Sequence, residues 1–262
     1  MRNKKVDKKK YYSEQLHFDK EYEKISKDEE NLIIPTSEIG RYRNPDSCPL
    51  YGRVFSFYLL GDVSNKKVLD YGCGDGDNAV FLAKKGALVT AIDCSNEAIE
   101  LTRAKAKANG VDGSVEVIKM DAERTCFTDM EFDIVLGNAI LHHLDLERTR
   151  EEICRILKHG GIAIFREPIV GNVILKVLRK LIPIYPSNPT KEERPLTYKD
   201  LRFFGERFSQ TDWWEFEIFS RVNYLIKNIS FIHILHRIDY ILMQKFPFTR
   251  KLASCVVVRY IK

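Results

Sequence analysis

The sequence VLDYGCGDG at residues 68–76 decides the fold, because it joins a short β-branched run to a helical pattern. Its alternating glycines, Gly72, Gly74 and Gly76, allow the backbone to turn sharply and to approach a ligand closely, with helix amides facing that ligand. The spacing is GxGxG rather than the dinucleotide-binding GxGxxG, and an acid, Asp70, lies two residues before the first glycine. The stretch therefore predicts a ligand-binding turn at the end of a β-strand.

Short β-branched runs alternate with longer helical patterns beyond this turn, which is typical of βαβ units and a parallel sheet. Five strands are predicted, at residues 67–70, 88–93, 115–119, 132–136 and 162–165. The helices between them are predicted at 77–85, at 95–109 with Ser95 as N-cap, and at 146–158, which His159-Gly160-Gly161 ends. An antiparallel pair is predicted at 214–219 and 255–261. The fold class is thus a doubly wound, mostly parallel seven-stranded α/β sheet.

Two further segments flank this predicted sheet. Residues 1–60 are expected to form an N-terminal helical or cap segment, and residues 61–262 are expected to form the main domain. Within that domain we expect a substrate cap at about 168–212, with helices near 173–182 and after Thr197, and a helical insert at about 222–246. No apolar run is long enough for a membrane span, and the charged start has no apolar segment behind it, so we expect a cytoplasmic protein without a secretory signal.

Polar side chains follow four consecutive strands of the predicted sheet. Asp70 ends the first strand, Asp93 the second, Asp121-Ala122 follows the third, and Asn138 follows the fourth. Ligands of open α/β sheets bind in the crevice outside the carboxyl ends of the strands, and an acid at the second strand can accept hydrogen bonds from ribose hydroxyls. The pattern predicts a ligand that contains a nucleoside.

Residues 66–167 resemble the class I S-adenosylmethionine-dependent methyltransferases in the succession VLDYGCGDG, AIDCS, KMDAE, GNAILHHL and KHGGIAIFREP. The resemblance implies a Rossmann-like methyltransferase fold with S-adenosylmethionine as cofactor, S-adenosylhomocysteine as product and no metal. It also implies a set of cofactor-binding residues: Asp70, Gly72, Cys73, Gly74 and Gly76 around the methionine part, Asp93 on the ribose, Cys94, Asp121 and Ala122 around the adenine, and Asn138 at the methyl-donor site. The fourth strand lacks NPPY and DPPY, which disfavours methylation of DNA bases or protein glutamine.

Charge is distributed unevenly along the chain. The net charge of +5 divides into +5 for residues 1–10, +7 for residues 221–262 and −7 for residues 11–220. Nucleic-acid binders usually concentrate positive charge on the face that contacts phosphate, and the predicted catalytic part does the opposite. A nucleic-acid partner is therefore disfavoured. The basic C-terminal helices, which are apolar on one face, favour either core packing or peripheral contact with an anionic membrane.

Two adjacent histidines are the candidate catalytic residues. His142 and His143 directly follow the fourth strand, and histidine titrates near pH 7, as a general base should. Alternatively, these residues only start the next helix, one capping it and one packing. Two neighbouring histidines without a third ligand do not indicate a metal site, and the six cysteines form no CxxC pair.

Methyl transfer to a small or lipid-like metabolite is the leading interpretation, with alignment of nucleophile, methyl carbon and sulfur as the main catalytic task. Methylation of RNA through the basic ends, a cofactor-binding regulator without catalysis, and a nicotinamide oxidoreductase are the alternatives. The acceptor atom and the oligomeric state do not follow from the sequence.

Overall fold

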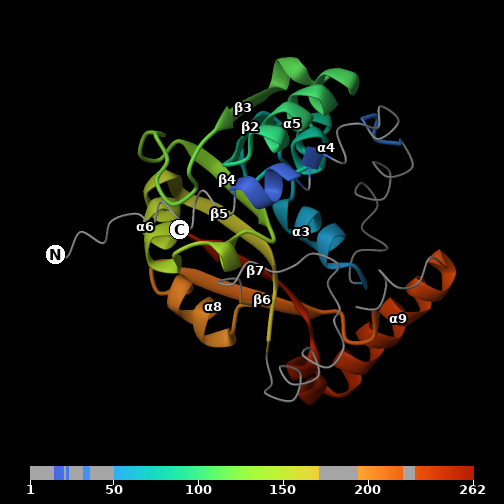
Figure 1. The fold of residues 1–262 in the computed structure, drawn as a ribbon. Coiled ribbons are helices and arrows are strands. Elements are labelled where there is room, and N and C mark those ends of the chain that lie inside the picture. Colours follow the sequence, from blue (N-terminus) through green and yellow to red (C-terminus); the bar gives the residue numbers. More distant parts are fainter. Residues whose placement is uncertain (1–14, 21, 24–31, 36–49, 171–193, 221–227) are drawn as a thin grey trace.

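Seven strands form one sheet in the computed structural model of the protein, which describes residues 15–20, 22–23, 32–35, 50–170, 194–220 and 228–262 (Figure 1). Their order is β3-β2-β1-β4-β5-β7-β6; β1 to β5 are parallel, and β7 is antiparallel to both β5 and β6. This confirms the predicted fold class. The strands are β1 (Lys67–Tyr71), β2 (Leu88–Asp93), β3 (Val115–Lys119), β4 (Phe132–Asn138), β5 (Leu157–Pro168), β6 (Gln210–Phe216) and β7 (Cys255–Ile261).

Helices cover both faces of the sheet (Figure 1). One face packs against α3 (Gly52–Leu60), α4 (Asp77–Lys84) and α5 (Asn96–Ala108). The other face packs against α6 (Leu146–Ile156) and α8 (Tyr198–Gly205). The structure also describes the helix α9 (Ile229–Lys245), the short 3-10 turns η3 (Asp112–Ser114), η4 (Leu141–His143) and η6 (Pro247–Leu252), and helical residues 15–20 and 22–23.

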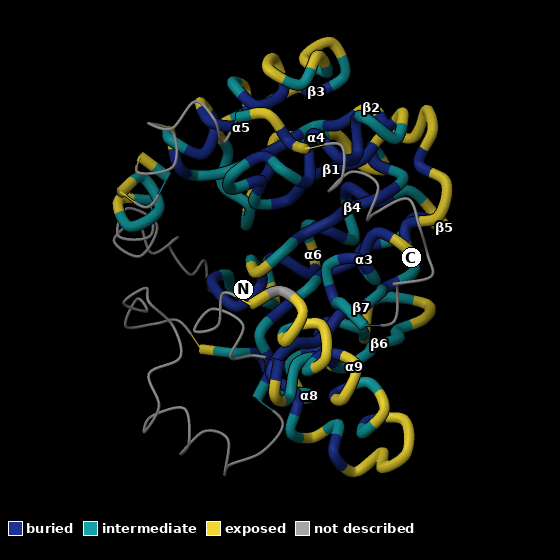
Figure 2. The backbone as a smooth tube through the Cα atoms, turned by 90° about the vertical axis from the view of Figure 1, so that its right-hand side faces the viewer, coloured by how far each residue is buried: buried dark blue, intermediate teal, exposed yellow. Residues whose placement is uncertain are grey.

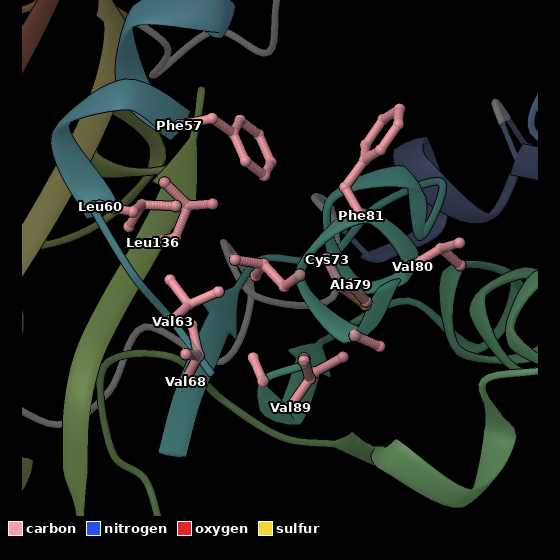
Figure 3. Packing of buried hydrophobic residues seen from close by; sticks show 14 of the residues in the cluster. Phe57, Leu60, Val63, Val68, Cys73, Ala79, Val80, Phe81, Val89 and Leu136 are labelled. Atoms are coloured by element: carbon pink, nitrogen blue, oxygen red, sulfur yellow. The ribbon is translucent and has the colours of Figure 1, made fainter. Parts of the chain in front are cut away.

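The central strand β1 supplies side chains to both layers, because successive strand residues point to opposite faces. Val68 packs with the α3 and α4 side, where it joins Phe57 and Leu136 (Figure 3). Leu69 and Tyr71 pack with the α6 and α8 side. All the β1 residues after the first are buried, as the dark strands in Figure 2 show. A near-continuous apolar strand of this kind is expected where helices cover both faces of a parallel sheet.

Predicted boundaries are wrong at the junction of α6 with β5 and at β6, and β4 continues to Asn138 rather than ending at 136. The sequence His159-Gly160-Gly161 does not end a helix but lies inside β5, which begins at Leu157 directly after α6. Leu157 can continue the apolar stripe of the helix and can also start the strand, so the pattern does not separate the two. Strand β6 spans Gln210–Phe216 rather than 214–219, because this edge strand begins with polar residues.

The described part of the predicted substrate cap, residues 194–212, contains α8 and the first residues of β6. Thr197 forms a capping box with Asp200 at the start of α8, as its position in the sequence predicts. The buried face of α8 then places Leu201 and Phe204 against Tyr260 of β7. The helix predicted at 173–182 lies outside the described residues. No helix that the structure describes is both long and apolar enough to cross a membrane.

Candidate functional site

Side chains pack closely against the first two glycines of the turn after β1. Gly72 and Gly74 have φ values of 75° and 52°, in the left-handed region that favours glycine. A Cβ atom at Gly72 would lie 2.6 Å from a side-chain carbon of Ile140, and one at Gly74 would lie 2.6 Å from the hydroxyl of Tyr22. The turn is therefore packed between Ile140, after β4, and Tyr22 of the N-terminal helical residues.

Asp70 lies fully buried in β1, beside this turn. Neither of its carboxylate oxygens has a hydrogen-bond partner among the described residues. The pKa of Asp70 is raised to about 7, chiefly by burial and also by the nearby carboxylates of Asp75 and Asp93, against the opposing effects of Arg53 and the Asn78 side chain. A buried carboxylate without a partner is costly, and a cation that binds next to it removes that cost.

Asp93 connects the end of β2 to the glycine turn. Its Oδ2 accepts a hydrogen bond from the backbone N–H of Gly74 at 3.0 Å, and its Oδ1 accepts one from the N–H of Ser95 at 2.9 Å. Burial raises its pKa, although these backbone N–H groups oppose the rise. A carboxylate has about four lone-pair sites, so Asp93 retains capacity for hydroxyl donors of a ligand.

The acid and amide after β3 and β4 also lie at this carboxyl edge of the sheet. Asp121 Oδ1 accepts the N–H of Glu123 at 2.8 Å, which leaves its second oxygen for another donor. Asn138 Oδ1 accepts a hydrogen bond from Arg166 of β5 at 3.3 Å. Any ligand contact of the Asn138 carbonyl oxygen therefore competes with Arg166.

Three of the predicted cofactor residues offer mainly backbone atoms or packing at this edge. Cys73 is buried in the core, where its sulfur accepts a hydrogen bond from the Thr102 hydroxyl at 3.4 Å. The carbonyl oxygen of Ala122 accepts a hydrogen bond from the Tyr71 hydroxyl. Cys94 is half-buried immediately after β2. Cys73 can thus contact a ligand at this edge only through its backbone.

His142 and His143 form the short turn η4 after β4, and neither caps α6, whose N-cap is Asp145. The two rings lie 4.0 Å apart between centroids. Nδ1 of His142 lies 2.7 Å from Oε2 of Glu167, a residue near the end of β5. The side chains of His142 and Glu167 are both buried, with 5% and 0% of their areas exposed. The structure therefore joins one of the predicted histidines to a buried carboxylate.

Glu167 also fixes the turn that carries the histidines. Its Oε1 accepts hydrogen bonds from the backbone N–H groups of Ile140 and Leu141, both at 2.9 Å. Glu167 was not among the predicted site residues, although it follows the same rule as Asp70 and Asp93, a polar residue at the carboxyl end of a strand. Within the described residues, no three His, Cys, Asp or Glu side chains gather closely enough to hold a metal ion.

Helical residues 15–20 and 22–23 lie against the same edge. Asp19 accepts a hydrogen bond from the Ser95 hydroxyl at 2.6 Å, and the rings of Phe18 and His143 meet edge to face at 5.4 Å. Tyr22 reaches Gly74, as described above. The N-terminal residues therefore touch both the glycine turn and the histidine turn. No local sequence pattern indicates these contacts, because they join residues that lie far apart in the chain.

Comparison with known proteins places this edge in context. Residues 68–161 match a family model described as a methyltransferase domain. The sarcosine/dimethylglycine N-methyltransferase of Halorhodospira halochloris is 38% identical over 104 residues, which are 39% of this chain and 37% of that protein. The sterol 24-C-methyltransferase of Gibberella zeae is 30% identical over 155 residues, which are 54% of this chain and 41% of that protein. The chain spans less than half the length of either relative.

A solved structure shows the same fold over more of the chain. Geranyl diphosphate C-methyltransferase from Streptomyces coelicolor, in complex with geranyl diphosphate and S-adenosyl-L-homocysteine, superposes with a TM-score of 0.55 at 14% identity. The match covers 80% of this chain and 78% of the other. At this identity the likeness concerns the fold alone.

Proposed function

We propose that the protein transfers a methyl group from S-adenosylmethionine to a small or lipid-like acceptor, and that residues 68–161, which match the methyltransferase-domain model, bind this cofactor. The observation that carries the proposal is Asp70, a buried carboxylate without a hydrogen-bond partner among the described residues, beside a glycine turn. The cofactor is a cation, and a cation is the group that such a carboxylate stabilises.

The residues at the carboxyl edge fit this cofactor. Asp70 and the backbone at Gly72 and Gly74 would hold its methionine part, Asp93 its ribose hydroxyls, and Asp121 its adenine. Bound there, the cofactor supplies an electrophilic methyl group on a sulfonium. The chain binds and orients the acceptor and excludes water, and good alignment of this kind lowers a barrier by about 7 to 11 kcal/mol.

His142 is the residue that we propose as general base. Glu167 would accept a hydrogen bond from the Nδ1–H group of His142, and this selects the tautomer whose Nε2 carries a lone pair. Nε2 can then take a proton from an acceptor hydroxyl or amine, while the buried carboxylate stabilises the resulting imidazolium. Glu167 acts through His142 and is therefore a positioning residue. His143, which contacts Phe18, is proposed to line the acceptor side.

The acceptor class follows from charge and from the relatives. The net charge of −7 over residues 11–220 disfavours a polyanionic acceptor such as RNA at this edge. The relatives are named for sterol and for sarcosine or dimethylglycine, a lipid and a small amine. We propose an acceptor within this range, a lipid-like molecule or a small metabolite, without assigning a particular compound.

Transfer of labelled methyl groups from S-adenosylmethionine into fractionated cell extract tests the proposal. Label is expected in the organic-soluble or the small-molecule fraction; label confined to RNA would replace the proposed acceptor class. His142→Ala and His143→Ala are expected to lower turnover without weakening cofactor binding, whereas His159→Ala, at an exposed histidine in β5, should do neither. Unchanged turnover in both of the first two variants would remove histidine from the mechanism. Tight cofactor binding without transfer to any fraction would indicate a regulator instead.

A further inference from the structure

The helix α9 has an apolar row on the side that faces away from the protein. The row repeats at intervals of three and four residues, as one face of a helix requires. Phe246, which joins α9 to the 3-10 turn η6, and Phe248 within η6 continue the row, and Phe248 is 72% exposed. We call this set the C-terminal stripe, and it consists of Phe231, Ile234, Ile238, Ile241, Phe246 and Phe248. Figure 2 shows exposed residues along α9, and Figure 1 shows the helix projecting beyond β6 and β7.

The opposite face of α9 is held against the protein. His236, Asp239 and Met243 are buried on that face. Asp239 accepts hydrogen bonds from the backbone N–H groups at positions 218, 219 and 220 at 2.9 to 3.0 Å. The hydroxyl of Tyr51, next to α3, lies 2.7 Å from Nδ1 of His233. These contacts fix the rotation of the helix, so the C-terminal stripe cannot turn inward without breaking them.

Exposed basic side chains flank the stripe. Arg237, Lys245 and Lys251 are exposed beside it. The only acid of α9 and η6 is Asp239. Because Asp239 is buried and its carboxylate serves backbone donors, no acidic side chain of α9 or η6 balances the exposed lysines and arginine. The surface therefore combines exposed aliphatic and aromatic side chains with net positive charge.

The sheet places this surface at the same edge as the candidate site. Cys255, the first residue of β7, pairs with Pro168 at the carboxyl end of β5, so the chain between β6 and β7 lies beyond that end. Arg166 joins the two regions, because it bonds Asn138 and also forms an ion pair with Glu217 at 2.7 Å. A lipid surface that contacts the stripe would therefore lie at the edge where the acceptor is expected to enter.

We propose that the C-terminal stripe docks on an anionic lipid bilayer, with its apolar side chains in the interface and Arg237, Lys245 and Lys251 at the phosphate headgroups. Aromatic and aliphatic side chains flanked by lysine and arginine are the chemistry that a bilayer interface accommodates. Charge decides against a second copy of this chain, because two such surfaces would bring the same cations together. The docking is independent of methyl transfer, although it would serve the proposed lipid-like acceptor.

Sedimentation of the full-length protein with vesicles tests the proposal. One set contains phosphatidylcholine alone, and the other contains equal parts of phosphatidylcholine and phosphatidylglycerol. We expect binding to the anionic set only, weakened about tenfold or more by Ile238→Ser with Phe248→Ser, since apolar area and anionic attraction both set the affinity. Lys245→Glu with Lys251→Glu should abolish the preference for phosphatidylglycerol. The matched control is Leu88→Ser, at an exposed leucine that starts β2, and it should bind as the unaltered protein does.

Failure of the intact protein to bind anionic vesicles would overturn the proposal, and so would unchanged binding of the Ile238→Ser, Phe248→Ser variant. A concentration-dependent dimer that this variant dissociates, without vesicle binding, would assign the surface to self-association instead. The thermal shift that S-adenosylmethionine produces serves as a separate measurement in every variant. It should stay unchanged, so that loss of docking is distinguished from loss of folding or of the proposed activity.

Discussion

Replacement of Asp70 by Asn should change both the pH dependence of stability and the affinity for the cofactor. The folded-state pKa of Asp70 is raised from 3.8 to about 7, so folding favours its protonated form. The stability of the cofactor-free protein is then highest below the unfolded pKa and falls as the pH rises through 7. Proton linkage with these two pKa values gives a loss of roughly 2 to 3 kcal/mol between pH 5 and pH 8. Asp70→Asn, which is neutral at every pH, should not show this part of the loss.

Chemical denaturation at pH 5 and pH 8, without cofactor, measures the difference between the two proteins. Asp112→Asn, at an exposed aspartate, is the control and should follow the unaltered protein. Calorimetric titration should then show that S-adenosylmethionine binds the unaltered protein more weakly as the pH falls below 7, because its positive charge favours ionised Asp70, and that Asp70→Asn binds weakly at all pH values. Identical pH profiles of stability in the unaltered protein and Asp70→Asn would refute the reasoning.

Three further substitutions test separate contacts. Glu167→Gln keeps an oxygen for the backbone donors but places an NH2 group toward Nδ1 of His142. We expect kcat to fall about tenfold to a hundredfold, the acid limb of its pH profile to change, and cofactor affinity to be retained. An unchanged pH profile would leave Glu167 a structural role only. Gly76→Ala should lower the free energy of unfolding by about 2 kcal/mol or more, because φ is 80° and the added Cβ would lie 2.7 Å from the backbone of α5. The control is Gly110→Ala, which has φ of 67° and open space around it and should therefore lower the free energy of unfolding by less. Ser95→Ala removes the α5 N-cap and should cost about 1 kcal/mol by the same measurement, and a neutral effect would contradict the capping.

Local pattern was sufficient for much of the sheet. The limits of β2, β3 and β7 agree with the sequence prediction, because each is a β-branched run bounded by turn or polar residues. The pattern failed where two elements meet without a break, as at Leu157, and where an edge strand is polar, as at Gln210. In both places pairing with neighbouring strands decides the boundary, and a single sequence does not display pairing.

In the candidate site, too, the sequence predicts the positions of polar residues but not their tertiary contacts. The acids at strand ends could be found, because the topology of a parallel sheet brings its carboxyl ends together. Which partner each side chain meets could not: Asp70 has none among the described residues, Asn138 meets Arg166, and His142 meets Glu167. The hydrogen bond between Asp19 and Ser95 joins residues that are 76 positions apart in the sequence, and no local pattern predicts it.

The position of β7 has a consequence for the order in which the protein can form during synthesis. This strand follows β1 to β6 in the sequence, yet it lies between β5 and β6 and pairs with both. Until residues 255–261 leave the ribosome, β6 has no neighbour in the sheet and β5 presents an unpaired edge, which is a template for intermolecular pairing. A protein truncated before Cys255 would therefore lack both the β5–β7 and the β6–β7 interface. We expect such a chain to aggregate, even though it would contain all of residues 68–161.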